Sequence, residues 1–230
     1  MVSNLFDGNF IVEYTDGTRD WAKSIIYALG ASYRSLPEKI TNKIPIHYCA
    51  LCDGALYKNK TVAIIGGGDV AFTQAEYLSK ICKDVTIVMC DKNVTAAPQT
   101  FDRVSKIENI YIIYDYPVEE IYLLPDSHIH RYGLKPYNID KYSNYCLLVD
   151  GIFVAIGMIP NTQERIAMSK IVTDTLGYIT ANENGKTAID GFFAAGDVRA
   201  KAVRQSVTAA ADGAYAINSV IAYLARREVN

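Results

Sequence analysis

The most regular pattern of apolar and polar positions begins at Thr61. It predicts a strand, a three-glycine turn, a helix and a second strand over Thr61–Ile65, Gly66–Gly68, Asp69–Ile81 and Asp84–Met89. Two parallel strands need a crossover connection of this kind, and the right-handed βαβ unit is its usual form. This part of the chain is therefore expected to be an α/β domain.

Before this unit, the alternation over Phe10–Tyr14 predicts a strand that ends in a turn at Thr15–Thr18. An apolar run from Ser24 to Leu29 predicts an inward strand. Residues 34–46 contain two prolines and show no periodicity, so we expect a connector that crosses between domains. The predicted domain boundary lies near Leu36.

After the unit, the pattern predicts alternating elements and then a small antiparallel set. The expected helix and strand are Gln99–Ile107 and Ile110–Tyr114, the antiparallel set is Pro117–Leu124, Ile129–Tyr132 and Tyr145–Val149, and a buried strand covers Ile152–Ile156. A sharp turn is expected at Gly157–Asn161. The chain then ends with a strand at Gly191–Ala195 and a long helix at Val203–Arg226.

Composition narrows the possible functions. Half of the 230 residues are apolar, which is enough for one large or two small cores, and the net charge of -2 disfavours nucleic-acid binding. No apolar stretch is long enough for a transmembrane helix, and the first residues do not resemble a signal peptide, so we predict a cytoplasmic protein. Of the five cysteines, Cys82, Cys90 and Cys146 are expected to be buried and to act only as small apolar core residues.

Cys49 and Cys52 form a CxxC motif directly before the predicted βαβ unit. A four-ligand zinc site would need a second cysteine pair at similar spacing, which the chain lacks, so redox chemistry is preferred over zinc or inert thiols. The thiolate is the reactive form in such motifs. The adjacent Asp53 could exchange protons with the dithiol, or it could be only a helix cap.

Gly66, Gly68 and Ala71 match the dinucleotide fingerprint GxGxxA between a strand and a helix. The helix N-terminus would hold the pyrophosphate. Asp91, after the second strand, could bind the ribose of NADH or be a solvated turn residue. A 2′-phosphate would need an arginine, and none occurs between the second strand and Arg103, so NADPH is disfavoured. A third alternative is that the nicotinamide site has been lost.

Near the C-terminus, Gly196 and Asp197 follow a predicted strand, where α/β proteins bind ligands. Arg204 and Gln205 lie near the start of the long helix. The alternative for Asp197 is a carboxylate that only stabilises the helix dipole.

Four blocks of sequence resemble the low-molecular-weight thioredoxin reductases in order and spacing. They are CALCDG, VAIIGGGDVA, GIFVAIGMIPNT and TAIDGFFAAGDVRAKAVRQSVTAAADGAYAI, and YALGAS is similar to the strand that leaves the family's FAD domain. The resemblance implies an α/β, Rossmann-like FAD/NAD(P)-binding fold with two domains. Residues 1–36 and 159–230 would form the FAD domain, and residues 37–158 the nicotinamide-dinucleotide domain that carries the CxxC.

The resemblance also implies a flavoprotein disulfide oxidoreductase that passes two electrons through FAD to a dithiol and on to thioredoxin or a similar small dithiol protein. Cys52 would face the flavin, Cys49 would exchange with the partner disulfide, and Asp53 would be the acid. The remaining implied contacts are Gly196 and Asp197 with FAD, Arg204, Gln205 and Ser206 near the flavin ring, and Gly66, Gly68 and Ala71 with a nicotinamide dinucleotide. A homodimer is implied as well.

The chain departs from the family where NADPH is bound. It has Met89, Cys90, Asp91 and Thr95 where NADPH-dependent members carry a histidine and arginines; Thr73 and Gln74 replace the usual glutamates, and Met158 replaces a histidine. These changes resemble family branches that use another reductant, such as ferredoxin. They disfavour NADPH, and the use of NADH stays open.

A second departure concerns the start of the family fold. The family begins with a βαβ unit of roughly 30 residues whose GxGxxG holds FAD, and Asn4–Gly8 contains no such motif. The FAD domain is therefore expected to be incomplete, with apolar edges exposed at Ser24–Leu29 and Gly191–Ala195. Three explanations are open for such an incomplete domain. The chain is a truncated form, or another chain supplies the missing part. Alternatively, the chain is a non-catalytic or redox-sensing paralogue that has lost flavin or nicotinamide binding. A flavin-free dithiol exchanger is a further alternative.

Overall fold

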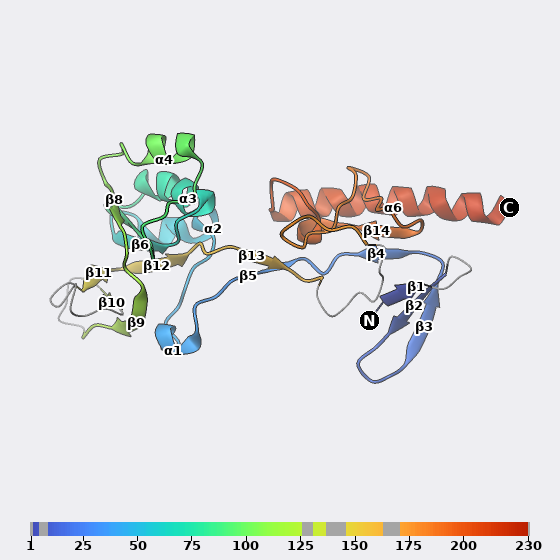
Figure 1. Ribbon diagram of the computed structural model, residues 1–230, viewed down its shortest axis with the longest axis horizontal. Helices are drawn as coiled ribbons and strands as arrows, with labels where there is room; N and C mark the ends of the chain where they lie inside the picture. Colours follow the sequence, from blue (N-terminus) through green and yellow to red (C-terminus); the bar gives the residue numbers. More distant parts are fainter. Residues whose placement is uncertain (1, 5–8, 126–130, 137–145, 163–170, 230) are drawn as a thin grey trace. The chain divides into compact units, whose positions relative to one another are not determined.

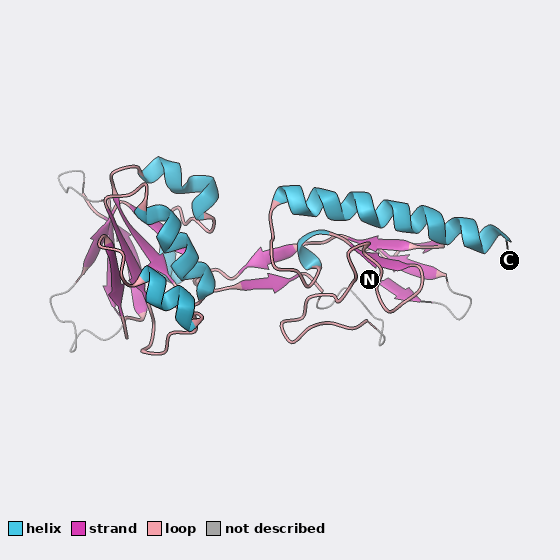
Figure 2. Ribbon diagram, turned by 90° about the horizontal axis from the view of Figure 1, so that it is seen from above, coloured by secondary structure: helices cyan, strands magenta, loops and turns pink. Residues whose placement is uncertain are grey.

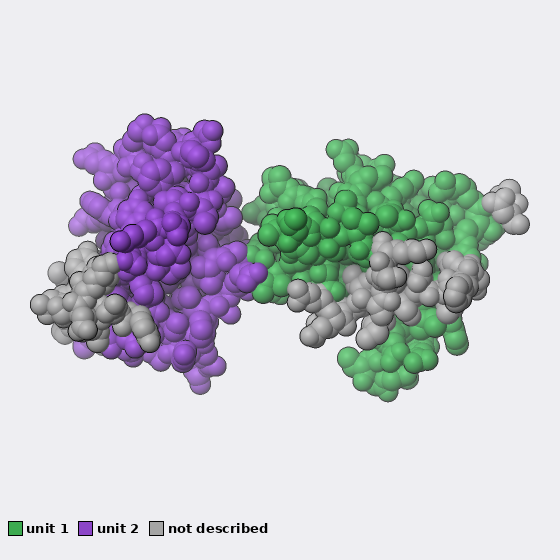
Figure 3. Space-filling model, viewed as in Figure 1, with its two compact units in different colours: residues 1–32, 158–230 green, residues 33–157 purple. Residues whose placement is uncertain are grey.

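The computed structural model describes residues 2–4, 9–125, 131–136, 146–162 and 171–229 (Figure 1). The chain forms two compact units (Figure 3). Unit 1 combines Met1–Ser32 with Met158–Asn230, and unit 2 is the continuous segment Tyr33–Gly157.

Unit 2 is built on a four-stranded parallel sheet. Its strands, in spatial order, are β12 (Gly151–Val154), β6 (Thr61–Ile65), β7 (Asp84–Val88) and β8 (Ile110–Ile113). The crossover from β6 to β7 is α3 (Asp69–Ser79). The predicted βαβ unit is confirmed, and each predicted strand of this sheet is found within two residues of its expected ends.

Both faces of this sheet are covered, which explains the unbroken apolar runs of its strands. On β6, Val62 and Ile64 pack with α3 and with α4 (Pro98–Val104). Ala63 and Ile65 pack on the opposite face, against an antiparallel sheet of β9, β10 and β11 (Figure 2). These strands span Val118–Leu123, Tyr132–Pro136 and Leu147–Val149; the predicted strand residues Ile129, His130 and Tyr145 lie outside the described residues.

Unit 2 also contains three short helical segments before its parallel sheet begins. The connector contains α1 (Glu38–Thr41), which the sequence pattern did not predict; it follows Pro37 and ends at Asn42, whose φ of 47° is left-handed. Proline is tolerated ahead of a first turn because its missing N–H is not needed there. Around the CxxC lie α2 (Ala50–Asp53) and the 3₁₀ turn η1 (Gly54–Tyr57).

Unit 1 contains an antiparallel sheet, a parallel strand pair and the long helix. The sheet has the order β1 (Val2–Asn4), β2 (Phe10–Glu13) and β3 (Arg19–Ala22). The parallel pair is β4 (Ile25–Tyr27) and β14 (Phe192–Ala194). The turn η2 (Gly196–Val198) and α6 (Ser206–Val229) follow. Within the described residues, no helix combines the length and apolarity needed to cross a membrane.

The expected exposure of apolar edges in unit 1 is found only in part. All three residues of β14 are buried, because Phe192 packs against the rings of Phe10 and Tyr27. In β4 only Ile26 is exposed. The antiparallel sheet and the parallel pair therefore share one core that covers β14.

The predicted sharp turn at Gly157–Asn161 is wrong in its main part. Met158–Pro160 forms strand β13, which pairs with β5 (Ala31–Tyr33). Gly157 has a positive φ of 106°, and a turn is found only at Asn161 and Thr162, after the strand. The pairing partner lies far away in the sequence, so the local glycine and proline signal suggested a turn where the chain is extended.

Candidate active site

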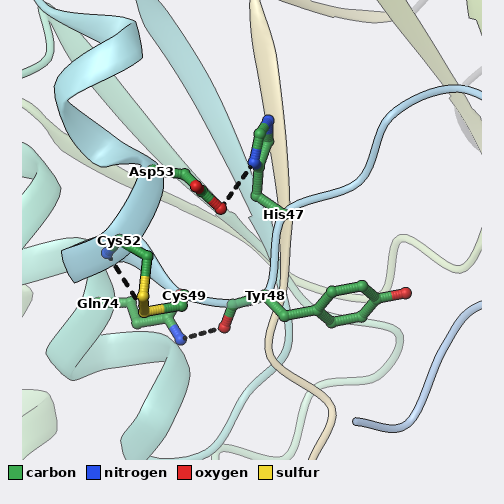
Figure 4. The surroundings of a disulfide bond; sticks show 6 residues. All are labelled: His47, Tyr48, Cys49, Cys52, Asp53 and Gln74. Atoms are coloured by element: carbon green, nitrogen blue, oxygen red, sulfur yellow. Dashed lines mark hydrogen bonds and ion pairs between the residues drawn. A yellow bond between two sulfur atoms is a disulfide. The ribbon is translucent and has the colours of Figure 1, made fainter. Parts of the chain in front are cut away.

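Cys49 and Cys52 form a disulfide, with their Cα atoms 5.3 Å apart (Figure 4). Cys49 is the N-cap residue of α2, and its Sγ and carbonyl oxygen both accept from the backbone N–H of Cys52, each at 3.2 Å. Ala50 is buried in the core of unit 2, whereas Leu51 and Cys52 are exposed. The short helix is therefore anchored on one side and presents the disulfide to solvent on the other.

Asp53 belongs to a hydrogen-bonded network with His47 and Tyr57. The Oδ2 atom of Asp53 lies 2.9 Å from Nδ1 of His47, and Nε2 of His47 lies 2.7 Å from the hydroxyl of Tyr57. Burial raises the pKa of Tyr57, so its phenol keeps the proton. Asp53 makes no side-chain cap to η1. The helix-cap alternative is therefore not supported, and Asp53 is available for proton exchange beside the disulfide.

Gln74 supports the loop that precedes the disulfide. Its Nε2 atom donates to the carbonyl oxygen of Tyr48 at 3.1 Å (Figure 4). Its buried Oε1 has no hydrogen-bond partner among the described residues. A glutamate here would place a second carboxylate oxygen against the Tyr48 carbonyl, so the amide is the side chain that fits this position.

Gly66, Gly68 and Ala71 lie together at one end of the unit 2 sheet. Gly66 and Gly68 line a cleft of about 630 Å³ at the carboxyl ends of β6, β7 and β12. Gly66 has a φ of 151°, and a Cβ there would lie 2.4 Å from the carbonyl oxygen of Ala155. Gly68 is the N-cap residue of α3, and Ala71 is fully buried. This arrangement suits the pyrophosphate of a dinucleotide, because the free N–H groups of a helix N-terminus attract anions.

Asp91 also lines this cleft, just after β7. Its Oδ1 accepts from the backbone N–H of Asn93 at 2.7 Å, and its Oδ2 lies 3.7 Å from Sγ of Cys90. Thr95 reaches back to the carbonyl oxygen of Gly67. No lysine, arginine or histidine is among the described residues that line the cleft.

Gly196 and Asp197 form η2 in unit 1. The N–H of Gly196 donates to Oδ2 of Asp212 at 3.0 Å. The buried Oδ1 of Asp197 lies 3.4 Å from Nζ of Lys201 but accepts no hydrogen bond within the described part of the chain. Buried polar atoms normally have a hydrogen-bond partner. A hydroxyl group of a bound cofactor could donate to this carboxylate oxygen.

Arg204 is next to this turn. Its guanidinium lies 3.8 Å above the ring of Tyr178, and its Nε donates to the carbonyl oxygen of Asp197 at 3.4 Å. Gln205 and Ser206 are exposed, and α6 begins at Ser206 rather than at the predicted Val203. The structure thus brings Asp197 and Arg204 together and leaves the side chains of Gln205 and Ser206 on the surface.

Sequence reasoning missed two sets of residues. His47 and Tyr57 flank the CxxC, and their spacing around Asp53 was a signal that could have been used. The second set is a buried ion cluster in which Asp212 contacts Arg199 at 2.6 Å and Lys201 at 3.0 Å. No spacing rule connects these residues, so only the folded chain could reveal the cluster.

Comparison with known proteins agrees with this arrangement. Residues 4–214 match the family model of pyridine nucleotide-disulphide oxidoreductases. The chain is 36% identical to a thioredoxin reductase of Listeria innocua over 220 residues, which are 94% of the chain and 67% of that protein. The chain belongs to the thioredoxin reductase family.

Solved structures support the same family. The crystal structure of thioredoxin reductase from Streptococcus pyogenes superimposes with a TM-score of 0.79 at 31% identity, over 98% of this chain and 72% of that one. Thioredoxin reductase from Giardia duodenalis gives a TM-score of 0.81 at 29% identity, over 94% and 71%. The predicted family, the Rossmann-like α/β fold and the oxidoreductase class are confirmed. The family implies a flavin cofactor, and the non-catalytic alternative is not favoured.

Proposed function

We propose that this thioredoxin reductase relative passes two electrons through FAD to the Cys49–Cys52 pair and on to thioredoxin or a similar small dithiol protein. The observation that carries the proposal is the disulfide on α2, with an exposed sulfur-bearing residue and Asp53 beside it. Cys52 would face the flavin, Cys49 would exchange with the partner, and Asp53 would move the proton. We also propose a cytoplasmic homodimer, on family resemblance.

The residues of unit 1 fit FAD as far as they are described. The unused acceptor on Asp197 and the guanidinium of Arg204 lie next to each other after a buried strand. FAD would supply two-electron transfer to the disulfide when bound. Asp197 would accept from its hydroxyl groups, and Arg204 would place a positive charge nearby. Segment 1–32 with 158–230 would be the FAD domain and segment 33–157 the dinucleotide domain.

The cleft of unit 2 fits a dinucleotide without a 2′-phosphate. Gly66 and Gly68 would cradle the pyrophosphate, but the described lining offers no cation for an additional phosphate. Asp91 would repel such a phosphate and could accept from a ribose hydroxyl. NADPH is therefore disfavoured, and NADH or a protein reductant such as ferredoxin is favoured.

The first test is the visible absorption spectrum of the purified chain, before and after anaerobic addition of NADH, NADPH and dithionite. Flavin bands that bleach with dithionite or NADH but not with NADPH are expected. Bleaching by NADPH at the same rate as by NADH would refute the assignment of the cleft. A chain that shows no flavin bands even after incubation with FAD would refute the flavoprotein proposal for this chain.

Two substitutions test the residue roles. Cys52→Ser should abolish reduction of oxidised thioredoxin, whereas Cys82→Ala, which removes a buried thiol outside the CxxC, should not. Equal loss in both would point to a folding defect. Asp91→Arg should increase NADPH use, with Asp91→Asn as the control that removes the charge without adding a cation. A response equal in both Asp91 variants would argue against recognition of the 2′-phosphate at this position.

A further inference from the structure

His47 is fixed on all sides next to the redox pair. Its backbone extends the edge of the sheet, because its N–H donates to Ile152 at 3.0 Å and its carbonyl oxygen accepts from Val154 at 2.7 Å. Its ring packs against Phe153 and meets Tyr57 edge-on, with centroid distances of 5.2 and 5.3 Å. Only 16% of the side chain is exposed, compared with 38% for Asp53. The network therefore opens to solvent at Asp53.

Both ring nitrogens of His47 have a partner, and the partners determine where its proton lies. Tyr57 is also held by packing, since a Cβ at Gly151 would lie 2.2 Å from its ring. An ionised carboxylate only accepts hydrogen bonds, so beside an ionised Asp53 the ring of His47 carries a proton on Nδ1 and donates it to Oδ2. In the neutral imidazole Nε2 is then an acceptor, and the hydroxyl of Tyr57 donates to it. The contact with His47 holds one of the two carboxylate oxygens of Asp53.

Exchange between the Cys49–Cys52 dithiol and a partner disulfide requires the transfer of protons as well as electrons. When the reduced pair attacks a partner disulfide, the Cys49–Cys52 bond forms and the partner S–S bond breaks. Two electrons move to the partner, and the two thiol protons must follow them to the two leaving thiolates. A carboxylate that takes a proton from an attacking thiol and returns it to a leaving thiolate completes this balance without another reactant.

The geometry points to His47 as a positioning residue for proton transfer by Asp53, with Tyr57 as the group that holds the other ring nitrogen of His47. This inference rests on the proposed function, since it assumes that Asp53 serves the dithiol.

The charged and titratable groups around this network are few. Asp53 and Tyr57 contact His47 directly. Arg131, Tyr132 and Asp150 act on Tyr57 through space. Phe153, which packs on the ring of His47, carries no charge.

The test is single-turnover exchange between the chemically reduced full chain and oxidised thioredoxin, followed by quenching and alkylation. Since acid–base catalysis contributes about 10²–10⁴-fold, His47→Ala should slow exchange at least about tenfold. His47→Asn keeps an N–H donor near the position of Nδ1. It should restore most of the rate.

Three comparisons separate this role from a purely structural one. In an Asp53→Asn background, His47→Ala should have almost no further effect. Tyr57→Phe should slow exchange, whereas Tyr77→Phe, a partly buried tyrosine of the same core, should not. Failure of His47→Asn to restore the rate, or full additivity of His47→Ala with Asp53→Asn, would overturn the inference. If the wild type does not reduce thioredoxin, the proposed function fails, and the same rescue and additivity measured with 2-hydroxyethyl disulfide still decide the role of His47.

Discussion

Gly66→Ala should strongly destabilise unit 2, because the structure leaves no room for a side chain at this position. The added Cβ would lie 2.4 Å from the carbonyl oxygen and 2.9 Å from the carbonyl carbon of Ala155. Neither backbone can move easily, since Ala155 donates to Ile65 at 2.8 Å and Gly66 donates to Val88 at 3.0 Å. The clash is therefore with fixed backbone rather than with a flexible side chain.

Two costs combine at Gly66. Forcing an extra carbon into a packed site costs about 1–3 kcal/mol. The φ of 151° is a conformation that residues with a Cβ rarely adopt, which adds about 1–3 kcal/mol. The free energy of unfolding of unit 2 should fall by about 2–6 kcal/mol. Gly68→Ala is the matched control: its Cβ would meet only Oγ1 of Thr95, at 3.4 Å, so only the loss of a favourable N-cap glycine, about 1 kcal/mol, is expected.

Native-state hydrogen exchange of the amides in β6 and β7 measures this difference, because these amides exchange through opening of unit 2. Since every 1.4 kcal/mol is about tenfold, Gly66→Ala should accelerate their exchange by more than about tenfold. Unchanged protection in Gly66→Ala, or an equal loss in Gly68→Ala, would show that the close approach to Ala155 is not what requires glycine here.

Two further predictions concern other parts of the chain. Asp212→Ala should lower the stability of unit 1 by about 3–5 kcal/mol, because it leaves the buried Arg199 guanidinium without its carboxylate; thermal melting followed by the helical signal of α6 measures this, and a smaller loss is expected in Asp212→Asn. Cys90 is exposed, contrary to the expectation that it is buried, whereas Cys82 is buried. At pH 8, iodoacetamide should therefore modify Cys90 well before Cys82, because burial raises the pKa of Cys82 to about 11 and keeps it a thiol. Equal labelling rates by mass spectrometry would contradict the burial of Cys82.

The sequence by itself determined the parts of this protein that depend on local pattern. The apolar run Thr61–Ile65, the glycine turn and the helix from Asp69 follow from contacts between near neighbours, and the structure places them where the pattern predicts. The CxxC and the family motifs are local as well. They were sufficient to predict the α/β fold, the family and the redox pair.

Tertiary structure alone decided which distant segments meet. β13 forms because β5 lies beside it, which no local signal at Gly157–Asn161 could indicate. Asp212 reaches back from α6 to the N–H of Gly196, and the ring of His47 lies between Asp53 and Tyr57. Such contacts depend on how buried polar groups find partners once the core has formed, so the chemistry around the redox pair is a property of the folded chain.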